Sequence, residues 1–218
     1  MKLYIYDHCP YCVKARMIFG YKNIDFEMIT LLNDDEETPI RMINQKMLPI
    51  LSLNPDVHRP ESLDIIEEVD KTTPPLFLSD DKTDKQLEDW LQGARAFTYP
   101  LAMPRWIKVG LEEFKTQEAV DYFTKKKEDY IGPFSEHLEK TEGYLKQAEE
   151  HLNKLEKILP ESGNFYLGGQ ASINDIHLYP TLRSLSVAKG LDFPPKVFAY
   201  AKKQEKFSKV PLHTSVAI

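Results

Sequence analysis

The chain has 218 residues, which allows one large domain or two small ones. Hydrophobic residues make up 42% and charged residues 28% of the chain, so it can bury a core and is not a disordered polymer. The net charge of −6 comes without a basic stripe, which argues against nucleic acid as the main partner. No run approaches the ~20 apolar residues of a membrane span, and the first residues do not form a secretory signal. We therefore expect a cytoplasmic protein that does not enter a membrane.

The first 75 residues alternate between strand and helix patterns. Strands are expected at residues 3–6, 25–29, 49–53 and, as a short antiparallel edge strand, 57–58. Helices are expected at residues 12–19, 38–43 and 61–69. The first helix is expected to end at Gly20, and the third to turn Leu63, Ile66 and Val69 inward. A strand–helix–strand opening implies a parallel pair, so the order βαβ followed by ββα predicts a small α/β domain at 1–75.

Residues 76–83 have the composition of a linker, and the strand signals vanish after them. A helix is expected to open near Leu87 and to be interrupted by Pro100 and Pro104. Later helices are expected at 119–130, along a leucine seam at 138–159, after a capping box at 172–175 and at 195–206. The seam fits one helix of a bundle or a coiled-coil dimer, and its shortness favours the bundle. The lysine run 125–127 is typical of a solvated helix face. Residues 84–218 thus predict an all-helical domain.

The segment Cys9-Pro10-Tyr11-Cys12 lies where the first strand gives way to the first helix, and it holds both cysteines of the chain. Two cysteines do not make a secreted disulfide framework. At a helix N-terminus, free N–H groups and the macrodipole favour a Cys9 thiolate, and Pro10 suits the first helical position. Cys12, almost one turn on, can close a disulfide with Cys9. Two inert buried cysteines are one alternative. A zinc site is another, but only His8 is adjacent and a second cysteine pair is missing, so we expect no metal.

Two further features reinforce this interpretation. With the cysteine pair upstream, Pro49 is expected to be cis and to leave the Leu48 backbone free to pair with an extended peptide. The alternative is an ordinary proline that begins a strand. The helix that opens at Glu61-Ser62 could hold a zwitterion, with its N-terminus on the carboxylate and Glu61 or Asp64 on the ammonium group. The alternative there is a plain helix cap.

Together these residues resemble the active site of a glutaredoxin. The helical second half makes the whole chain similar to the atypical bacterial glutaredoxins that are built like glutathione transferases. The opening run 1–12, the loop 31–35 and Pro60-Glu61-Ser62 carry the resemblance. It implies a thioredoxin-like N-terminal domain, a glutathione transferase-like helical bundle in the C-terminal domain, and a monomer in the cytoplasm.

The resemblance also implies a glutathione-dependent thiol–disulfide oxidoreductase that reduces disulfide-containing and glutathionylated proteins. Cys9 would be the nucleophile and Cys12 the resolving thiol, so that the two form a redox-active disulfide, with glutathione as co-substrate. Glutathione would be bound by Pro10, Tyr11, Leu48, Pro49, Glu61 and Ser62. Either Lys22 or Lys46 would reach its glycyl carboxylate.

Two other functions stay open on the sequence. A glutathione transferase that conjugates electrophiles would use the same two-domain plan, and Tyr6 at the end of a strand invites that comparison. Conjugation, however, does not need Cys12. A non-enzymatic scaffold of this fold would bind a partner through the leucine seam, and the presence of both cysteines argues against it.

Overall fold

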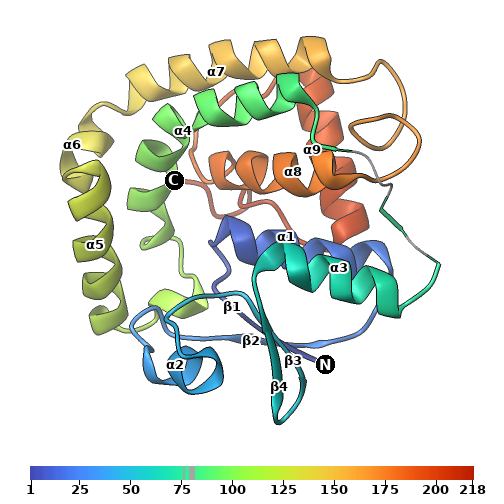
Figure 1. Cartoon of the computed structure of the whole chain (residues 1–218). Coiled ribbons are helices and arrows are strands. Elements are labelled where there is room, and N and C mark those ends of the chain that lie inside the picture. Colours follow the sequence, from blue (N-terminus) through green and yellow to red (C-terminus); the bar gives the residue numbers. More distant parts are fainter. Residues whose placement is uncertain (76, 79–81) are drawn as a thin grey trace.

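A four-stranded sheet forms the base of the molecule (Figure 1). The structure is a computed structural model that describes residues 1–75, 77–78 and 82–218. The strand order is β2-β1-β3-β4. Strands β1 (Lys2–Ile5) and β2 (Glu27–Thr30) are parallel, while β3 (Ile50–Asn54) and β4 (Val57–Pro60) are antiparallel. The predicted crossover pair and the predicted edge strand are both confirmed.

Three helices accompany the sheet: α1 (Pro10–Tyr21), α2 (Glu37–Ile43) and α3 (Ser62–Thr72). Helices α1 and α3 lie between the sheet and the helical half, and α2 lies on the opposite side of the sheet (Figure 1). The predicted inward position of Leu63 is wrong, because its side chain is 44% exposed. The helix begins at Ser62, so its buried face follows Ser62, Ile65, Ile66 and Val69 at helical spacing and leaves Leu63 outside.

Gly20 does not end the first helix as predicted. Helix α1 continues to Tyr21, and its C-cap is Lys22. A Cβ atom on Gly20 would lie 1.8 Å from the carbonyl oxygen of Ser208, the last residue of α9 (Pro195–Ser208). The glycine is required there because the backbone of α9 touches the backbone of α1.

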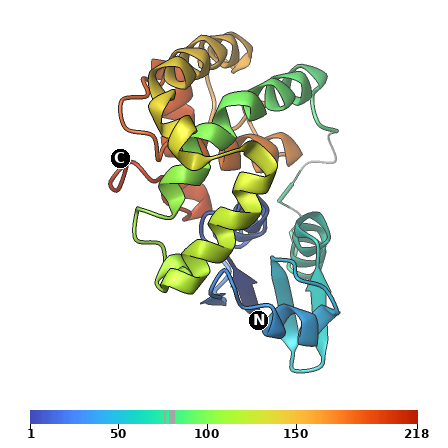
Figure 2. The same ribbon diagram turned by 90° about the vertical axis from the view of Figure 1, so that its left-hand side faces the viewer.

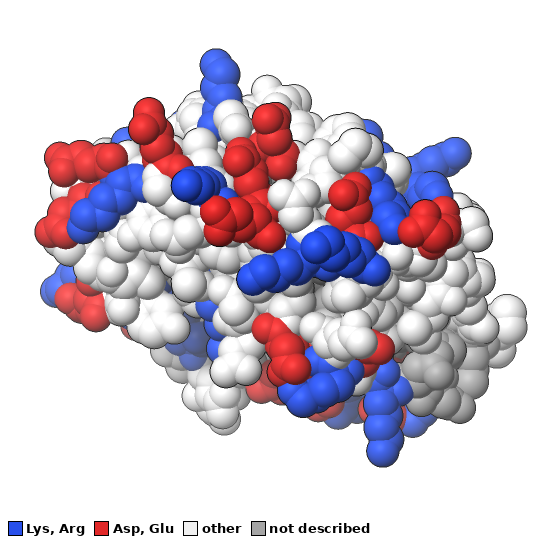
Figure 3. Space-filling view, turned by 90° about the horizontal axis from the view of Figure 1, so that it is seen from above, with Lys and Arg blue, Asp and Glu red and all other residues white. Residues whose placement is uncertain are grey.

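The helical half contains α4 (Lys85–Trp106), the 3₁₀ turn η1 (Glu112–Phe114) and α5 (Gln117–Ile131), then α6 (Phe134–Glu139), α7 (Thr141–Ile158), α8 (Ile173–Leu185) and α9. Figure 2 shows α5 crossing the near side of the molecule with the sheet below it. Basic and acidic side chains are interspersed on the face that carries α7 (Figure 3). Among the residues described, no helix is both long and apolar enough to span a membrane.

The predicted interruption of α4 by its two prolines is wrong, because the helix continues through Pro100 and Pro104. Each proline removes a backbone hydrogen bond, at a cost of about 3 kcal/mol in a helix interior. Burial against α6, α7 and α8 outweighs this cost, and Leu101 is completely buried. The guanidinium of Arg105 also donates to the carbonyl of Leu101 at 2.8 Å within the proline-containing turn.

The leucine seam is divided between two helices. Leu138 lies in α6, and the remainder of the seam runs along α7 and ends at Leu159, its C-cap. Ala148, Leu152 and Leu155 are completely buried within the chain, where α7 packs on α4. The bundle interpretation is therefore confirmed over the coiled-coil dimer. The predicted linker 76–83 includes residues 76 and 79–81, which lie outside the described residues, so the domain bounds stay a prediction.

Helix α8 begins at the predicted capping box and joins the two halves. The Ser172 hydroxyl and the Asp175 carboxylate cap the helix reciprocally, as expected. From this helix, the buried Arg183 donates to a carboxylate oxygen and to the carbonyl of Asp7, each at 2.6 Å. Burial alone would raise the pKa of Asp7, but the charges of Arg183 and Arg16 outweigh it and hold that pKa well below its ordinary value. The loop that leads into α1 is thereby fixed against the helical half.

Candidate active site

Cys9 is the N-cap residue of α1, and Pro10 follows as its first residue. The backbone of Cys9 is extended, with φ −67° and ψ 120°, and its own side chain makes no capping hydrogen bond. The carbonyl of Cys9 accepts the hydrogen bond of the Val13 N–H at 2.9 Å, so the helix begins directly at this cysteine. The sulfur therefore lies beside N–H groups that have no partner within the helix.

The two cysteines are unequal. Cys12 is completely buried, and burial raises the pKa of its thiol well above the ordinary value. A hydrogen bond from the Cys12 side chain is the main cause that lowers the pKa of Cys9 to about 6, against the opposing effect of burial. A positive charge on His8 and the N–H groups of Tyr11 and Cys12 act in the same direction. The structure thus favours one thiolate, at the more accessible cysteine.

His8, the residue before Cys9, is held by a carboxylate from the helical half. It is buried, and its backbone N–H and its ring Nδ1 lie 2.8 and 2.7 Å from the same carboxylate oxygen of Glu113. Glu113 belongs to η1 in the helical half, is completely buried, and keeps its second oxygen without a hydrogen-bond partner among the described residues. The Glu113 carboxylate thus holds in place, next to Cys9, the ring whose positive charge lowers the pKa of that thiol. The helical half therefore contributes to the acidity of the nucleophile.

We expect the alkylation rate of the reduced protein to follow a single titration centred near pH 6. The thiolate is the reactive form, so the rate rises with pH through the pKa of Cys9 and is nearly constant above pH 7. A free cysteine, with a pKa of about 8.5, would still be gaining reactivity there. Iodoacetamide kinetics between about pH 4 and 9, with the modified residue located by peptide mass, measures this profile.

Glu113→Gln is the informative variant for this profile. The amide keeps the shape of the side chain but removes the carboxylate that holds the His8 ring beside Cys9, so the pKa of Cys9 loses a lowering influence and the midpoint should move to higher pH. Lys108→Gln, an exposed change of one charge on the helical half, should leave the midpoint in place. An unchanged midpoint in Glu113→Gln would show that His8 does not act through its charge.

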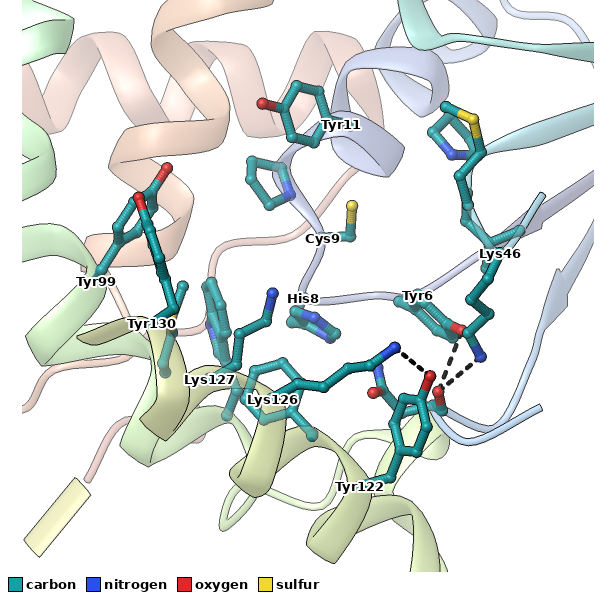
Figure 4. A pocket seen from close by; sticks show the side chains of 18 of the residues that line it. Tyr6, His8, Cys9, Tyr11, Lys46, Tyr99, Tyr122, Lys126, Lys127 and Tyr130 are labelled. Carbon is teal, nitrogen blue, oxygen red and sulfur yellow. Dashed lines mark hydrogen bonds between the residues drawn. The ribbon is translucent and has the colours of Figure 1, made fainter. Parts of the chain in front are cut away.

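A pocket of about 460 Å³ opens beside Cys9 (Figure 4). It is lined by all predicted site residues except the buried Cys12, namely Cys9, Pro10, Tyr11, Leu48, Pro49, Glu61 and Ser62. The Leu48–Pro49 peptide bond is cis, as predicted. The pairing of β3 with β1 includes Ile50 but neither Leu48 nor Pro49. The sequence features that seemed separate along the chain therefore meet around one sulfur atom.

Helix α3 presents its N-terminus to this pocket. Its N-cap residue Glu61 has a φ of 65°, a left-handed conformation that is uncommon outside glycine, and its side chain forms no capping hydrogen bond. The first N–H groups of α3 are therefore not taken by the side chain of Glu61. Asp64, the alternative to Glu61 for an ammonium group, is not part of the pocket lining.

The two candidate lysines lie in different places. The ammonium of Lys22 donates to a carboxylate oxygen of Asp70 and to the carbonyl of Pro75, both at 2.7 Å, and Lys22 does not line the pocket. Lys46 does line it, and donates to the carbonyl of Asn33 at 2.9 Å. Burial lowers the pKa of Lys46. Of the two, only Lys46 is placed to reach a ligand beside Cys9.

The wall opposite Cys9 comes from α4 and α5, and no motif in the sequence indicated it. Lys126 and Lys127 line the pocket and do not simply form a solvated face; burial lowers the pKa of Lys127 (Figure 4). The ammonium of Lys126 donates to the hydroxyl of Tyr122 and lies 4.4 Å from the centre of its ring. Tyr122, Lys126 and Tyr130 are spaced four residues apart, so their common helix face could have been found from the sequence.

Within the described ranges, no group of three His, Cys, Asp or Glu side chains could hold a metal ion.

Comparisons with known proteins agree with this architecture. Residues 3–76 match the glutathione S-transferase N-terminal domain, and residues 86–217 match the glutaredoxin 2 C-terminal domain. Glutaredoxin 2 of Escherichia coli strain K12 is 41% identical over 218 residues, the full length of both chains. The crystal structure of glutaredoxin 2 from Salmonella typhimurium in complex with glutathione has a TM-score of 0.94 at 42% identity, over 100% of this chain and 98% of that one.

More distant likeness concerns the fold alone. Glutathione transferase Omega 3C from Trametes versicolor has a TM-score of 0.57 at 19% identity, over 97% of this chain and 84% of that one. Fold and site together define a disulfide oxidoreductase of the glutaredoxin type, built on the glutathione transferase plan. The chain belongs to the glutaredoxin 2 family. It is a glutathione-dependent oxidoreductase, which this membership favours over a transferase that conjugates electrophiles.

Proposed function

We propose that Cys9 is the nucleophile of this oxidoreductase and Cys12 its resolving thiol. The observation that carries the proposal is the inequality of the two sulfurs: Cys9 is acidic and opens onto the pocket, and Cys12 is buried directly behind it. The Cys9 thiolate attacks the glutathione sulfur of a glutathionylated protein and forms a Cys9–glutathione disulfide. The bond between glutathione and the protein breaks, and the protein leaves as a thiolate that takes up a proton. A second glutathione then releases Cys9 and leaves as oxidised glutathione.

For a protein disulfide, Cys12 completes the reaction. Cys9 forms a mixed disulfide with one substrate sulfur, Cys12 attacks Cys9, and the substrate leaves with both sulfurs reduced. Two molecules of glutathione then reduce the Cys9–Cys12 disulfide. The short helical spacing between the two cysteines supports this step because the intramolecular attack needs little rearrangement.

The same pocket is proposed to bind the glutathione moiety. The backbone of Leu48 would pair with the cysteinyl residue of the tripeptide, and Pro10, Tyr11 and Pro49 would flank it. Glu61 and Ser62, at the free N-terminus of α3, would hold the γ-glutamyl end, since N–H groups bind a carboxylate and Glu61 an ammonium group. Lys46 would meet the glycyl carboxylate. The Salmonella relative was crystallised with glutathione, which supports a site for this tripeptide here.

The proposed substrates are disulfide-containing and glutathionylated proteins, without nucleic acid or membrane partners. The proposed compartment is the cytoplasm, where glutathione keeps thiols reduced. We propose a monomer, because the buried part of the α7 seam packs against α4 of the same chain and is not offered to a second copy.

Cys12→Ser tests the division of labour. The variant should reduce a glutathionylated peptide within about threefold of the wild-type rate, because glutathione resolves that intermediate. It should lose on the order of 100-fold or more in reducing a protein disulfide, because the resolving attack is missing. Cys12→Ala is the matched control: the serine hydroxyl can still donate to the Cys9 sulfur and the methyl group cannot. Equal losses on both substrates in Cys12→Ser would contradict the two-step scheme.

A further inference from the structure

A second cavity lies beside the Cys9 pocket, beyond Tyr11. Its volume is about 270 Å³, and its walls come from α1, α4 and α8. Pro10, Tyr11, Tyr99 and Trp106 line both cavities, so the two meet at the ring of Tyr11, which is 57% exposed. A molecule attached to a sulfur at Cys9 could therefore extend into either cavity.

Basic side chains from three helices face this second cavity, and none of the described residues that line it is acidic. They are Lys14 from α1, Arg95 from α4 and His177 from α8. The ammonium of Lys14 lies 2.7 Å from Nδ1 of His177 and 5.5 Å from the centre of the Tyr11 ring. No ion pair of Lys14 or Arg95 is found within the described part of the chain. Among the residues that the structure describes, these two positive charges have no acidic partner, although the whole chain carries −6.

The electrostatics of the three groups agree with this geometry. Burial, and then the neighbouring charge of Arg95, lowers the pKa of Lys14 to about 8. Burial, and then the charge of Lys14, lowers the pKa of His177 to about 4, so His177 is neutral at pH 7 and accepts from Lys14. A carboxylate in the cavity would relieve the repulsion between Lys14 and Arg95 and could accept a two-pronged hydrogen bond from the guanidinium.

We propose that this cavity is a subsite for an acidic side chain on the protein half of the disulfide substrate, with Lys14 and Arg95 as its ligands. The inference rests on the proposed function, which places the glutathione half in the pocket with Lys46 and Glu61. The protein half is joined to that glutathione by one sulfur–sulfur bond, which Cys9 breaks. Its neighbouring residues must then lie alongside the glutathione, and the cavity beyond Tyr11 is an adjoining space whose positive charge complements an acidic side chain.

The test uses S-glutathionylated peptides that are identical except for Glu or Gln at positions within two residues of the cysteine. We expect the wild type to prefer the best Glu peptide by about fivefold in kcat/KM at about 50 mM salt, and less at high salt. Arg95→Gln and Lys14→Gln should reduce the preference to below about twofold, while Lys14→Arg keeps it. Lys146→Gln, an equal loss of charge at an exposed position of α7, should also keep it.

A second substrate separates this subsite from the chemistry at Cys9. The mixed disulfide of glutathione and 2-mercaptoethanol has no carboxylate on its non-glutathione half, so Arg95→Gln should reduce it at the wild-type rate. Arg95 is the more decisive position because the Lys14 ammonium also interacts with the Cys9 thiolate. The proposal is overturned if the wild type shows no preference for Glu, if Arg95→Gln slows both substrates equally, or if its only effect is a higher KM for glutathione. A wild type inert toward every mixed disulfide would instead refute the proposed function itself.

Discussion

Cys9→Ser should lose all measurable disulfide reduction, a loss on the order of 10³-fold or more, because a serine hydroxyl is not ionised near neutral pH. The hydrogen bonds and the positive charge that favour a thiolate act on the sulfur of Cys9. Cys12 cannot take over as the nucleophile. Cys12 is completely buried, and its pKa is raised. The measurement is turnover of a glutathionylated peptide with glutathione in excess.

The binding pocket should keep its shape in Cys9→Ser, so the experiment separates loss of the nucleophile from loss of glutathione binding. Serine differs from cysteine by one atom, and the other lining residues, such as Leu48 and Glu61, are untouched. Calorimetry should therefore find glutathione bound to Cys9→Ser within about threefold of the wild-type affinity, since the contacts of the tripeptide backbone are retained. Loss of turnover together with loss of binding and of thermal stability would point to misfolding. Retained turnover would remove Cys9 from the mechanism.

The sequence was most informative where neighbouring residues determine the result. A cysteine before a proline at a strand–helix junction, a proline at the start of a strand and a Ser–Asp capping box each act within a few residues. The cis bond at Pro49 and the reciprocal cap at Ser172 and Asp175 are confirmed for that reason. Local patterns cannot show that these motifs lie together in space. The resemblance to glutaredoxins indicated that they form one active site.

Predictions failed where distant parts of the chain meet. Glu113 reaches His8 from 105 residues away, and nothing in the residues around either one indicates the contact. Pro100 and Pro104 were expected to break a helix on local propensity, but burial of α4 among its neighbours decided otherwise. Lys126 is exposed, as the solvated-face prediction expects, but Lys127 is half-buried, because α5 lies over the Cys9 pocket and the sequence does not show this placement.

Gly20 illustrates the same limit and leads to the largest expected change in stability. Gly20→Ala should destabilise the protein by about 3 kcal/mol, because a Cβ atom 1.8 Å from the Ser208 carbonyl oxygen cannot be accommodated by turning a side chain. At this chain length, that corresponds to a drop of roughly 6–12 °C in Tm. Gly143→Ala is the matched control in α7, where nothing lies within 4 Å of the added atom.

The two alanine variants should move stability in opposite directions. At Gly143 the methyl group meets no neighbour, so the higher helix propensity of alanine should stabilise the protein by about 0.5–1 kcal/mol. At Gly20 the same propensity gain is present, but α1 and the end of α9 must separate to admit the atom. Cys9 lies about 16 Å away along α1, so its alkylation profile in the folded Gly20→Ala protein should stay unchanged. Urea unfolding of both variants measures the difference, and a Gly20→Ala protein as stable as Gly143→Ala would show that the two backbones do not touch.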